Sequence, residues 1–386
     1  MSQADSATPF IQAVAEQVRI ELAPLAQAID QEGLYPGEFM RHLGALGGFG
    51  AALSAQDGGS GLTLAEQIEI TTQVGRACGS TAFLVWCQSC CAWYLAHSPN
   101  AAVRGRYIRQ VARGELLAGT GMSNAVKHLA GIEKILLRAQ RNTDGSGYTV
   151  NGSLPWVSNV GDGHLAVVAA SIEGEGYIMF AVPSTAKGFD TRGCLQFSGL
   201  EGTQTLNLRF HNVQVPNNDV LAHPNQFTEY IRRIKPGFVL GQAGMGLGIT
   251  EGCLDVMRES NTSTAHVNMF LDDQEPDIAA QLALLKAQAA TLARQAQEGV
   301  TPILPVLKLR AAVSELTLKA ANSAVLHAGA KGYLALHPAQ RRLREAVFVA
   351  IVTPALKHLR KEIHDIEQAA SAAANGTQSD VALATH

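Results

Sequence analysis

A cysteine cluster is the first group of residues whose types and spacing could do chemistry. Cys87-Gln-Ser-Cys90-Cys91 contains the CxxC spacing that zinc sites and redox dithiols use. A structural zinc site needs four ligands, and neither a second CxxC nor an HxxxH lies nearby to complete the set. Six cysteines in 386 residues are also too few for a disulfide scaffold. We therefore interpret the cluster as small apolar residues of a buried helix and predict no metal site.

Isolated titratable side chains form a second group of candidates. His128 follows Lys127, whose positive charge would lower the pKa of the imidazole and favour a neutral base. An ordinary position in a surface loop is the favoured interpretation of His128, with a role as catalytic base as the alternative, so the sequence leaves the catalytic residues unknown. Arg341 and Arg344 lie three residues apart on one face of a predicted helix. They could bind an anionic substrate or pair with acidic neighbours such as Glu345.

The composition excludes several classes of protein. With 47% hydrophobic and 16% charged residues, the chain is long and apolar enough to fold into two or three domains. A net charge of −3 is too balanced for binding nucleic acid or an anionic membrane. Apolar runs such as 161–170 fall short of the roughly 20 residues that cross a bilayer, and residues 1–9 carry no export signal. We expect a cytoplasmic protein with a small-molecule substrate.

The hydrophobic period changes twice along the chain. Apolar residues recur at helical spacing up to about residue 117, as in Phe10, Val14 and Val18. Short runs rich in Val, Ile, Thr, Phe and Tyr then alternate with Gly, Asn, Asp and Pro turns. They predict six antiparallel strands, at residues 135–139, 148–151, 165–170, 177–182, 206–210 and 213–215. Helical periodicity returns in four pieces, at residues 229–261, 277–299, 305–328 and 338–368.

These blocks predict an α+β fold with three domains. An N-terminal all-α domain covers residues 1–117, and a central antiparallel β-barrel or sandwich covers 118–222. A C-terminal four-helix bundle covers 223–368. The remaining residues, 369–386, are rich in Ala, Ser and Thr and are predicted to form a flexible tail.

This order of domains resembles the acyl-CoA dehydrogenase superfamily of flavoenzymes, and three local motifs support the resemblance. Residues 148–159, YTVNGSLPWVSN, are similar to the family's "dGyxlnGxKxWitN" strand pair. Residues 206–222 are similar to its "l.F.nV.VPxxxvLg" strand and domain exit. Residues 337–346 are similar to the "p..R..RDa" opening of its last helix. The resemblance covers about residues 9–366.

The family holds the isoalloxazine ring of its flavin between a loop and a short strand, and the resemblance assigns both here. The loop corresponds to residues 121–125, GMSNA, which keep a hydroxyl but lose the family's Glu-Pro pair. The strand corresponds to residues 156–158, where an aromatic face followed by a hydroxyl suits a flat heteroaromatic ligand. The resemblance therefore predicts flavin contacts from Met122, Ser123, Asn124, Trp156, Val157 and Ser158.

The chain departs from the family at the catalytic base. In most members a glutamate near the last bundle helix removes the proton α to a thioester carbonyl, and Thr353 followed by Pro354 occupies that position here. A subset carries its base at the start of the first bundle helix, near Ile234 and Lys235. Neither threonine nor isoleucine can abstract a weakly acidic C–H proton. At both positions, the ordinary dehydrogenation mechanism lacks its base.

The dinucleotide half of the cofactor site departs from the family as well. The family's arginine has no clear counterpart in residues 264–273, and Leu326 replaces the glutamine of its "QxxGGxGY" clamp. Losing a charged donor and an amide donor weakens pyrophosphate binding by about a few kcal/mol. The resemblance therefore implies FAD or FMN that binds weakly or enters as reduced flavin.

Different mechanistic classes are compatible with this pattern. Superfamily monooxygenases use reduced flavin from a separate reductase, need no α-proton base and show a Trp-x-Ser strand resembling residues 156–158. The alternatives are an acyl-CoA dehydrogenase or oxidase with an unidentified base, and a non-catalytic scaffold with a vestigial flavin site. We predict a flavin-dependent oxidoreductase that forms a homodimer or homotetramer. An acyl thioester is the candidate substrate, and a flavin reductase or an electron-transfer protein is the candidate partner.

Overall fold

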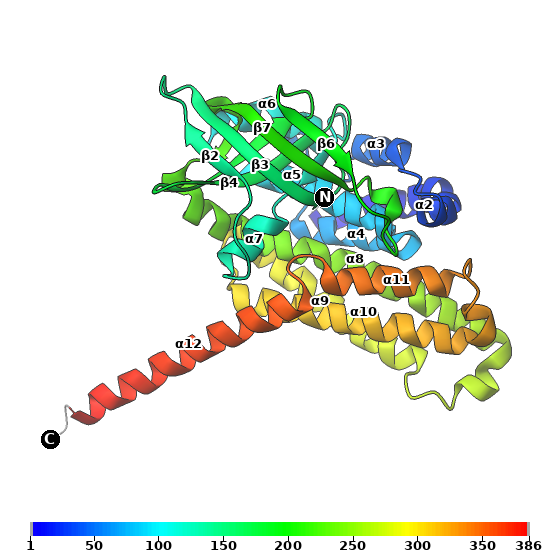
Figure 1. Ribbon diagram of the computed structural model, residues 1–386. Coiled ribbons are helices and arrows are strands. Elements are labelled where there is room, and N and C mark those ends of the chain that lie inside the picture. The colour runs from blue at the N-terminus through cyan, green and yellow to red at the C-terminus, as the bar shows by residue number, and fades with distance from the viewer. Residues whose placement is uncertain (1–2, 384–386) are drawn as a thin grey trace.

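Three layers of structure follow one another along the chain. A computed structural model describes residues 3–383, with side chains described from residue 7 to residue 372. Figure 1 shows a β-sheet at the top, N-terminal helices beside and beneath it, and a C-terminal helical bundle below. The last helix projects away from the bundle (Figure 1). The predicted fold class, with its N-terminal helices, central β domain and C-terminal helical bundle, is confirmed.

The N-terminal domain is helical, as the spacing of apolar residues predicts. Thr63 starts α4 with a capping box, in which its hydroxyl accepts from Ala65 N–H at 3.2 Å and Glu66 accepts from Thr63 N–H at 2.8 Å. Helix α5 is buried along almost its whole length, which explains why its sequence is apolar on every face. The helices are α1 (Gln3–Gln17), α2 (Ala26–Gln31), α3 (Gly37–Leu46), α4 (Leu64–Ala77), α5 (Gly79–His97) and α6 (Ala101–Ala112).

The central domain is one mixed sheet, in which β4 and β5 are buried on both faces while β3 and β7 alternate between buried and exposed residues. Its strands run in the order β6-β7-β3-β2-β4-β5-β8, and β1 pairs with β4 beside this path. Along β4, Leu165 and Val167 face the helices, while Ala166 and Val168 face a second core inside the β domain. The strands are β1 (Ala118–Thr120), β2 (Arg138–Arg141), β3 (Gly147–Val157), β4 (Leu165–Ile172), β5 (Gly176–Pro183), β6 (Phe189–Gly193), β7 (Leu206–Pro216) and β8 (Val220–Ala222).

The sheet differs from the sequence prediction in three respects. It folds like a sandwich without closing into a barrel. It is mixed and not purely antiparallel, because β1 and β2 both pair parallel to β4, which is not their neighbour in sequence. The predicted strands 206–210 and 213–215 are one strand, β7, interrupted by a bulge where Asn212 has a φ of 52°. The short strands β1, β6 and β8 carry too few residues to show a period.

The C-terminal bundle follows the predicted pieces with two differences. The piece 338–368 is two helices, separated at 352–355, because a proline at 354 lacks an N–H and restricts the residue before it. Helix α12 also continues into the segment 369–386 that the sequence assigns to a flexible tail, and its alanines favour helix. The helices are α8 (Pro224–Asn268), α9 (Glu275–Glu298), α10 (Ile303–Gly332), α11 (Pro338–Ile351) and α12 (Leu356–Leu383). Within residues 3–383, no helix is long and apolar enough to span a membrane.

Glycines on α8 allow close packing against the N-terminal helices. A Cβ added at Gly244 would lie 2.6 Å from the Ile68 carbonyl oxygen of α4. One added at Gly248 would lie 2.2 Å from the Thr72 carbonyl oxygen. Backbones in such contact leave no room for a side chain, so these positions join the bundle to the N-terminal domain.

We predict that Gly248→Ala destabilises the protein by about 1–3 kcal/mol, because α4 and α8 must move apart to admit the new methyl group. Gly105→Ala is the matched control, since Gly105 lies within α6 and a Cβ there has no neighbour within 4 Å. That control should gain up to about 1 kcal/mol from helix propensity. Urea unfolding followed by circular dichroism measures both changes, and equal stabilities of the two variants would contradict the packing argument.

Candidate functional site

The candidate site is a cavity of about 270 Å³ between α5, α8, α12 and a short helix, α7 (Ser123–Leu129). Its buried lining is apolar and includes Met122, Ile234 and Phe238, whereas Lys361 and Asp365 are exposed. A mostly apolar pocket with a few polar groups is typical of small-molecule sites. The complete lining is Tyr94, Met122, Val126, Leu129, Ala130, Ile231, Ile234, Lys235, Phe238, His358, Lys361, Glu362 and Asp365.

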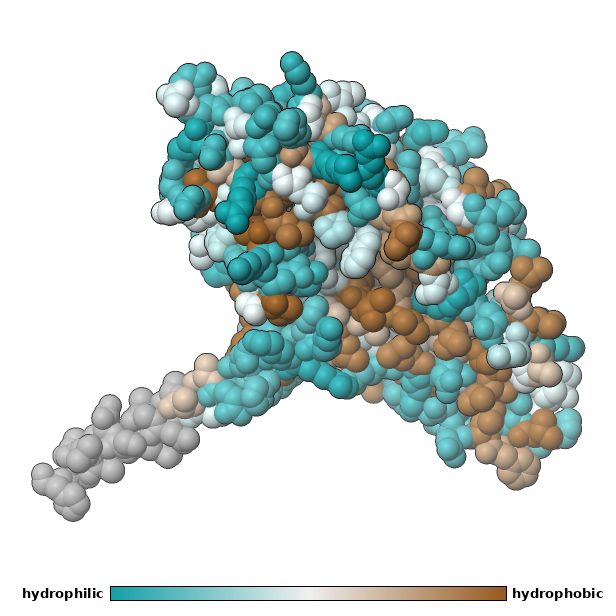
Figure 2. All heavy atoms as spheres, viewed as in Figure 1, coloured by the Kyte–Doolittle hydropathy of each residue, from teal (hydrophilic) through white to brown (hydrophobic). Residues whose placement is uncertain are grey.

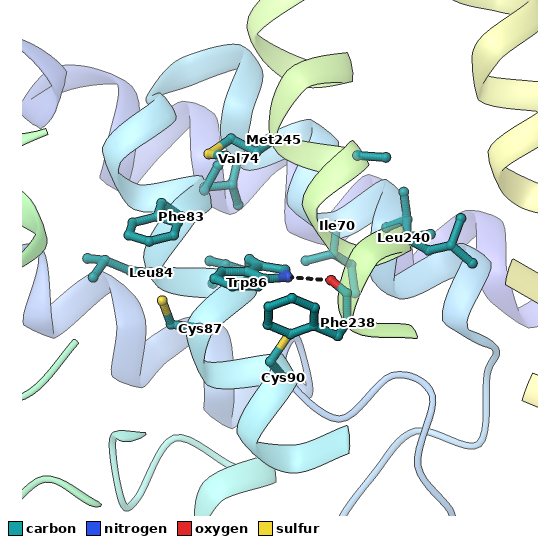
Figure 3. Close-up of a cluster of buried hydrophobic side chains, with 14 of the residues drawn as sticks. Ile70, Val74, Phe83, Leu84, Trp86, Cys87, Cys90, Phe238, Leu240 and Met245 are labelled. Carbon is teal, nitrogen blue, oxygen red and sulfur yellow. Dashed lines mark hydrogen bonds between the residues drawn. The ribbon is translucent and has the colours of Figure 1, made fainter. Parts of the chain in front are cut away.

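Hydrogen bonds from aromatic side chains fix the two helices that form one wall of the cavity. Trp86 Nε1 of α5 donates to the Phe238 carbonyl of α8 at 3.1 Å (Figure 3). One turn earlier on α8, the Ile234 carbonyl accepts from Trp93 Nε1 at 3.2 Å. Both acceptors belong to residues that line the cavity. The buried aromatic residues therefore set the positions of the cavity wall as well as filling the core.

A buried network holds the linker between α11 and α12 at the edge of the site. Gln242 Nε2 donates to the Thr353 carbonyl at 2.8 Å, and Gln242 Oε1 accepts from Arg310 Nε at 3.2 Å. The guanidinium of Arg310 also donates to the Val349 carbonyl at 2.6 Å. Burial lowers the pKa of Arg310 to about 10. Among the described side chains, no carboxylate forms an ion pair with Arg310. Its hydrogen bonds to neutral polar groups therefore matter for stability.

The same linker meets the segment predicted to contact flavin. Ser123 Oγ donates to Thr353 Oγ1 at 2.7 Å, although 230 residues separate the two hydroxyls in sequence. The family resemblance predicts a loop at Ser123 and Asn124. The structure differs, because these two residues begin helix α7. Met122 precedes that helix and lines the cavity. The structure therefore brings the predicted flavin segment, the Thr353 position and the cavity together.

The six predicted flavin contacts differ in exposure. The side chain of Ser123 is exposed, and so is Trp156, at 65% of its surface and with a φ of 57°. Asn124 is buried and bonded to Glu133 and to the Leu136 N–H. Ser158 is also buried, with Oγ 2.5 Å from Thr205 Oγ1, as are Met122 and Val157. Ser123 and Trp156 therefore offer side chains to a ligand, whereas the other residues offer mainly their backbone.

The other candidates from the sequence lie outside the cavity lining. His128 has both ring nitrogens engaged, Nδ1 with the Glu133 carbonyl at 2.9 Å and Nε2 with Tyr177 Oη at 2.8 Å. Arg344 forms an ion pair with Asp30 at 2.6 Å. Arg341 lies 3.8 Å from Glu345. These arginines therefore pair with acids, the second of the two roles considered for them.

The cysteine cluster lies in the core of α5. Cys87 and Cys90 are buried beside Trp86 and Phe238 (Figure 3). Burial raises the pKa of the Cys87 thiol well above its ordinary value, so this sulfur is protonated and unreactive at neutral pH. Among the described side chains, no group of three or more His, Cys, Asp or Glu residues is arranged to hold a metal ion.

Sequence reasoning did not identify an ion pair across the cavity. Lys235 Nζ of α8 donates to a Glu362 carboxylate oxygen of α12, and the two side chains are 29% and 23% exposed. The pair is more enclosed than the neighbouring pair of Lys361 and Asp365 on α12, whose side chains are 54% and 53% exposed. Lys235 and Glu362 are 127 residues apart, so no local motif signals their contact.

Comparison with known proteins gives matches along most of the chain. Residues 5–115 match the family model described as "Acyl-CoA dehydrogenase, N-terminal domain". The chain is 25% identical over 350 residues to mitochondrial isovaleryl-CoA dehydrogenase from Pongo abelii, covering 87% of this chain and 82% of that protein. It is 26% identical over 348 residues to glutaryl-CoA dehydrogenase from Desulfococcus multivorans, with coverage of 85% and 88%. A solved glutaryl-coenzyme A dehydrogenase complex has a TM-score of 0.86 at 22% identity, covering 93% and 94%.

The order of domains and the likeness to this solved structure define an acyl-CoA dehydrogenase fold. The family model over residues 5–115 and the curated relatives, which align with most of the chain, support membership of the acyl-CoA dehydrogenase superfamily.

We predict that Gln242→Leu destabilises the protein by about 2–4 kcal/mol, because it removes an acceptor from buried Arg310 and a donor from the Thr353 carbonyl. Gln140→Leu, at an exposed position of β2, is the control and should change stability by less than about 0.5 kcal/mol. Chemical denaturation of both variants makes the measurement. A loss at Gln242 no larger than at Gln140 would show that the network contributes nothing.

Proposed function

We propose that this protein is a flavin-dependent oxidoreductase that oxidises a short acyl thioester. The observation that carries the proposal is the apolar cavity, which adjoins the predicted flavin segment at Met122 and contains an enclosed carboxylate, Glu362. An apolar wall suits an acyl chain, and a carboxylate is a group that can accept a proton. The curated relatives, which are acyl-CoA dehydrogenases, support the same reaction class.

The residues that the resemblance assigns to the flavin fit its ring half better than its dinucleotide half. The exposed ring of Trp156 and the hydroxyl of Ser123 could contact an isoalloxazine ring. When bound, this ring would supply the two-electron acceptor that oxidation requires. At the dinucleotide positions, Leu326 and Phe270 are exposed apolar side chains that offer no charge to a pyrophosphate.

The volume of the cavity limits the substrate. About 270 Å³ is roughly the liquid volume of nine water molecules. Buried Phe238 and Tyr94 line the cavity, and both pack within the aromatic core. A short or branched acyl group fits this space.

Monooxygenation with reduced flavin is the second candidate. Thr353, in the linker between α11 and α12, contacts the predicted flavin segment because its hydroxyl accepts a hydrogen bond from Ser123. A threonine there supplies no base for removal of an α-proton, and oxygen transfer from a flavin needs none. In that mechanism a separate reductase would be the partner, whereas a dehydrogenase would pass its electrons to an electron-transfer protein.

We also propose that the protein forms a homodimer or homotetramer through its C-terminal bundle. Figure 2 shows hydrophobic residues gathered over the bundle. Phe270, after α8, is 81% exposed, and Tyr333, at the end of α10, is 82% exposed. Large exposed apolar groups of this kind are uncommon on monomers and suit a second copy of the chain. Light scattering measures the mass, and a monomer would contradict this proposal.

We predict that butyryl-CoA, mixed anaerobically with the FAD-reconstituted protein, bleaches the visible absorbance of the oxidised flavin. The reason is that the acyl group transfers two electrons to the flavin as its α,β bond becomes a double bond. No bleaching, together with thioester-dependent consumption of O₂ and reduced FMN, would favour monooxygenation. A colourless protein that binds neither oxidised nor reduced flavin would contradict both candidates and leave the scaffold alternative.

The affinity for FAD gives a further prediction. The isolated protein should hold substoichiometric flavin and bind oxidised FAD with micromolar or weaker affinity. Leu326→Gln should tighten FAD binding about tenfold, because one added hydrogen bond contributes about 1.4 kcal/mol. Leu336→Gln makes the same change at a similarly exposed position and should have no effect. Fluorescence titration measures the affinities, and full FAD occupancy after extensive dialysis would show that other residues hold the cofactor.

A further inference from the structure

We propose that Glu362 of α12 is the catalytic base that removes the α-proton of the acyl thioester. This inference rests on the proposed function, and it identifies the proton acceptor that the sequence does not reveal. Neither Thr353 nor Ile234, the two positions that the family resemblance indicates, carries a basic group. A base for a C–H proton must therefore come from another side chain in the cavity wall.

The titratable groups that face the cavity from each surrounding helix leave few choices. Tyr94 of α5 is buried, which raises the pKa of its hydroxyl well above its ordinary value, so it carries no negative charge at neutral pH. Lys235 of α8 is engaged with Glu362 and carries a positive charge. Lys361 and Asp365 form their own ion pair, at 2.6 Å, on the exposed side of α12. This leaves His358 and Glu362.

The hydrogen bond of His358 makes this ring a poor base. The Ala355 N–H donates to His358 Nδ1 at 3.3 Å, so the neutral ring carries its proton on Nε2 and has no free basic nitrogen. Burial and the charges of Lys357 and Lys127 lower the pKa of His358, which favours that neutral form. His358 is therefore suited to donate a hydrogen bond, and Glu362 remains as the proton acceptor.

The surroundings of Glu362 suit this role. Its side chain is 23% exposed, so it is shielded from bulk water but reachable from the cavity that it lines. The ion pair with Lys235 ties one carboxylate oxygen to α8, beside the buried Ile234. That contact orients the carboxylate across the cavity and leaves its second oxygen without a hydrogen-bond partner among the described side chains.

The substrate loses the proton on its α-carbon to a carboxylate oxygen of Glu362, and the electron pair of that C–H bond forms the new double bond. The β-carbon loses a hydride, for which a bound oxidised flavin would supply the two-electron acceptor of the proposed function. The products are the α,β-unsaturated thioester, protonated Glu362 and reduced flavin.

Proton exchange at the α-carbon isolates the role of Glu362 from the redox reaction. 3,3-Dimethylbutyryl-CoA has α-hydrogens but no hydrogen on its β-carbon, so it cannot be dehydrogenated. We expect the FAD-reconstituted protein in D₂O to exchange these α-hydrogens, measured as loss of their proton NMR signal. Glu362→Gln should slow the exchange at least about 100-fold while binding of the thioester is retained. Glu362→Asp, which keeps a carboxylate, should restore part of the rate.

Glu367→Gln is the matched control. Glu367 also lies on α12 and pairs with a lysine of another helix, Lys308, at 2.6 Å, but it does not line the cavity. This variant should exchange at the wild-type rate. Thermal unfolding and thioester binding show whether each variant keeps its fold. Exchange by Glu362→Gln at the wild-type rate, or no exchange by the wild-type protein, would overturn the proposal.

Failure of this inference can be distinguished from failure of the proposed function. If butyryl-CoA reduces the flavin of Glu362→Gln as fast as that of the wild type, the base is another group and the oxidoreductase function stands. If the wild type exchanges α-hydrogens through Glu362 but butyryl-CoA does not reduce its flavin, the assignment of the base stands and the dehydrogenase function fails.

Discussion

The contact between α5 and α8 is the constraint on which the candidate site depends. Glycines of α8 let its backbone touch α4, and the indole N–H groups of Trp86 and Trp93 bind carbonyls of α8. These carbonyls belong to Phe238 and Ile234, which face the cavity. Close packing leaves no freedom to slide one helix along the other, so the wall of the cavity is rigid before any ligand binds.

Polar contacts then join this rigid wall to the β domain. The buried side-chain oxygen of Gln88 in α5 accepts from the Ala118 N–H at 2.7 Å and from the Asn159 amide at 3.2 Å. These bonds link α5 to the start of β1 and to the turn that follows β3. On the opposite side, the hydroxyl of Ser123 reaches Thr353 of the bundle. The segments expected to contact a flavin are therefore held from both sides by groups that are far apart in sequence.

Two helices contribute the ion pair beside the cavity, with Lys235 on α8 and Glu362 on α12. Glu362 and Lys235 are partly enclosed, and each would be costly to desolvate alone. Pairing them across the cavity keeps a carboxylate in an apolar setting. Under the proposed function, a carboxylate held in this way on α12 would take the place of one at the Thr353 position, where the hydroxyl ties the linker to α7.

The sequence by itself determined the order of the three domains and the superfamily, because hydrophobic period and the Trp156–Ser158 motif are local properties of the chain. It did not determine the parallel strand pairs, which join segments that are not neighbours in sequence. Nor did it reveal Glu362 as a cavity residue, because the contact with Lys235 spans 127 residues and exists only when α8 and α12 are packed together. Tertiary structure decided which charged groups face the cavity, since burial and pairing depend on neighbours that folding brings together.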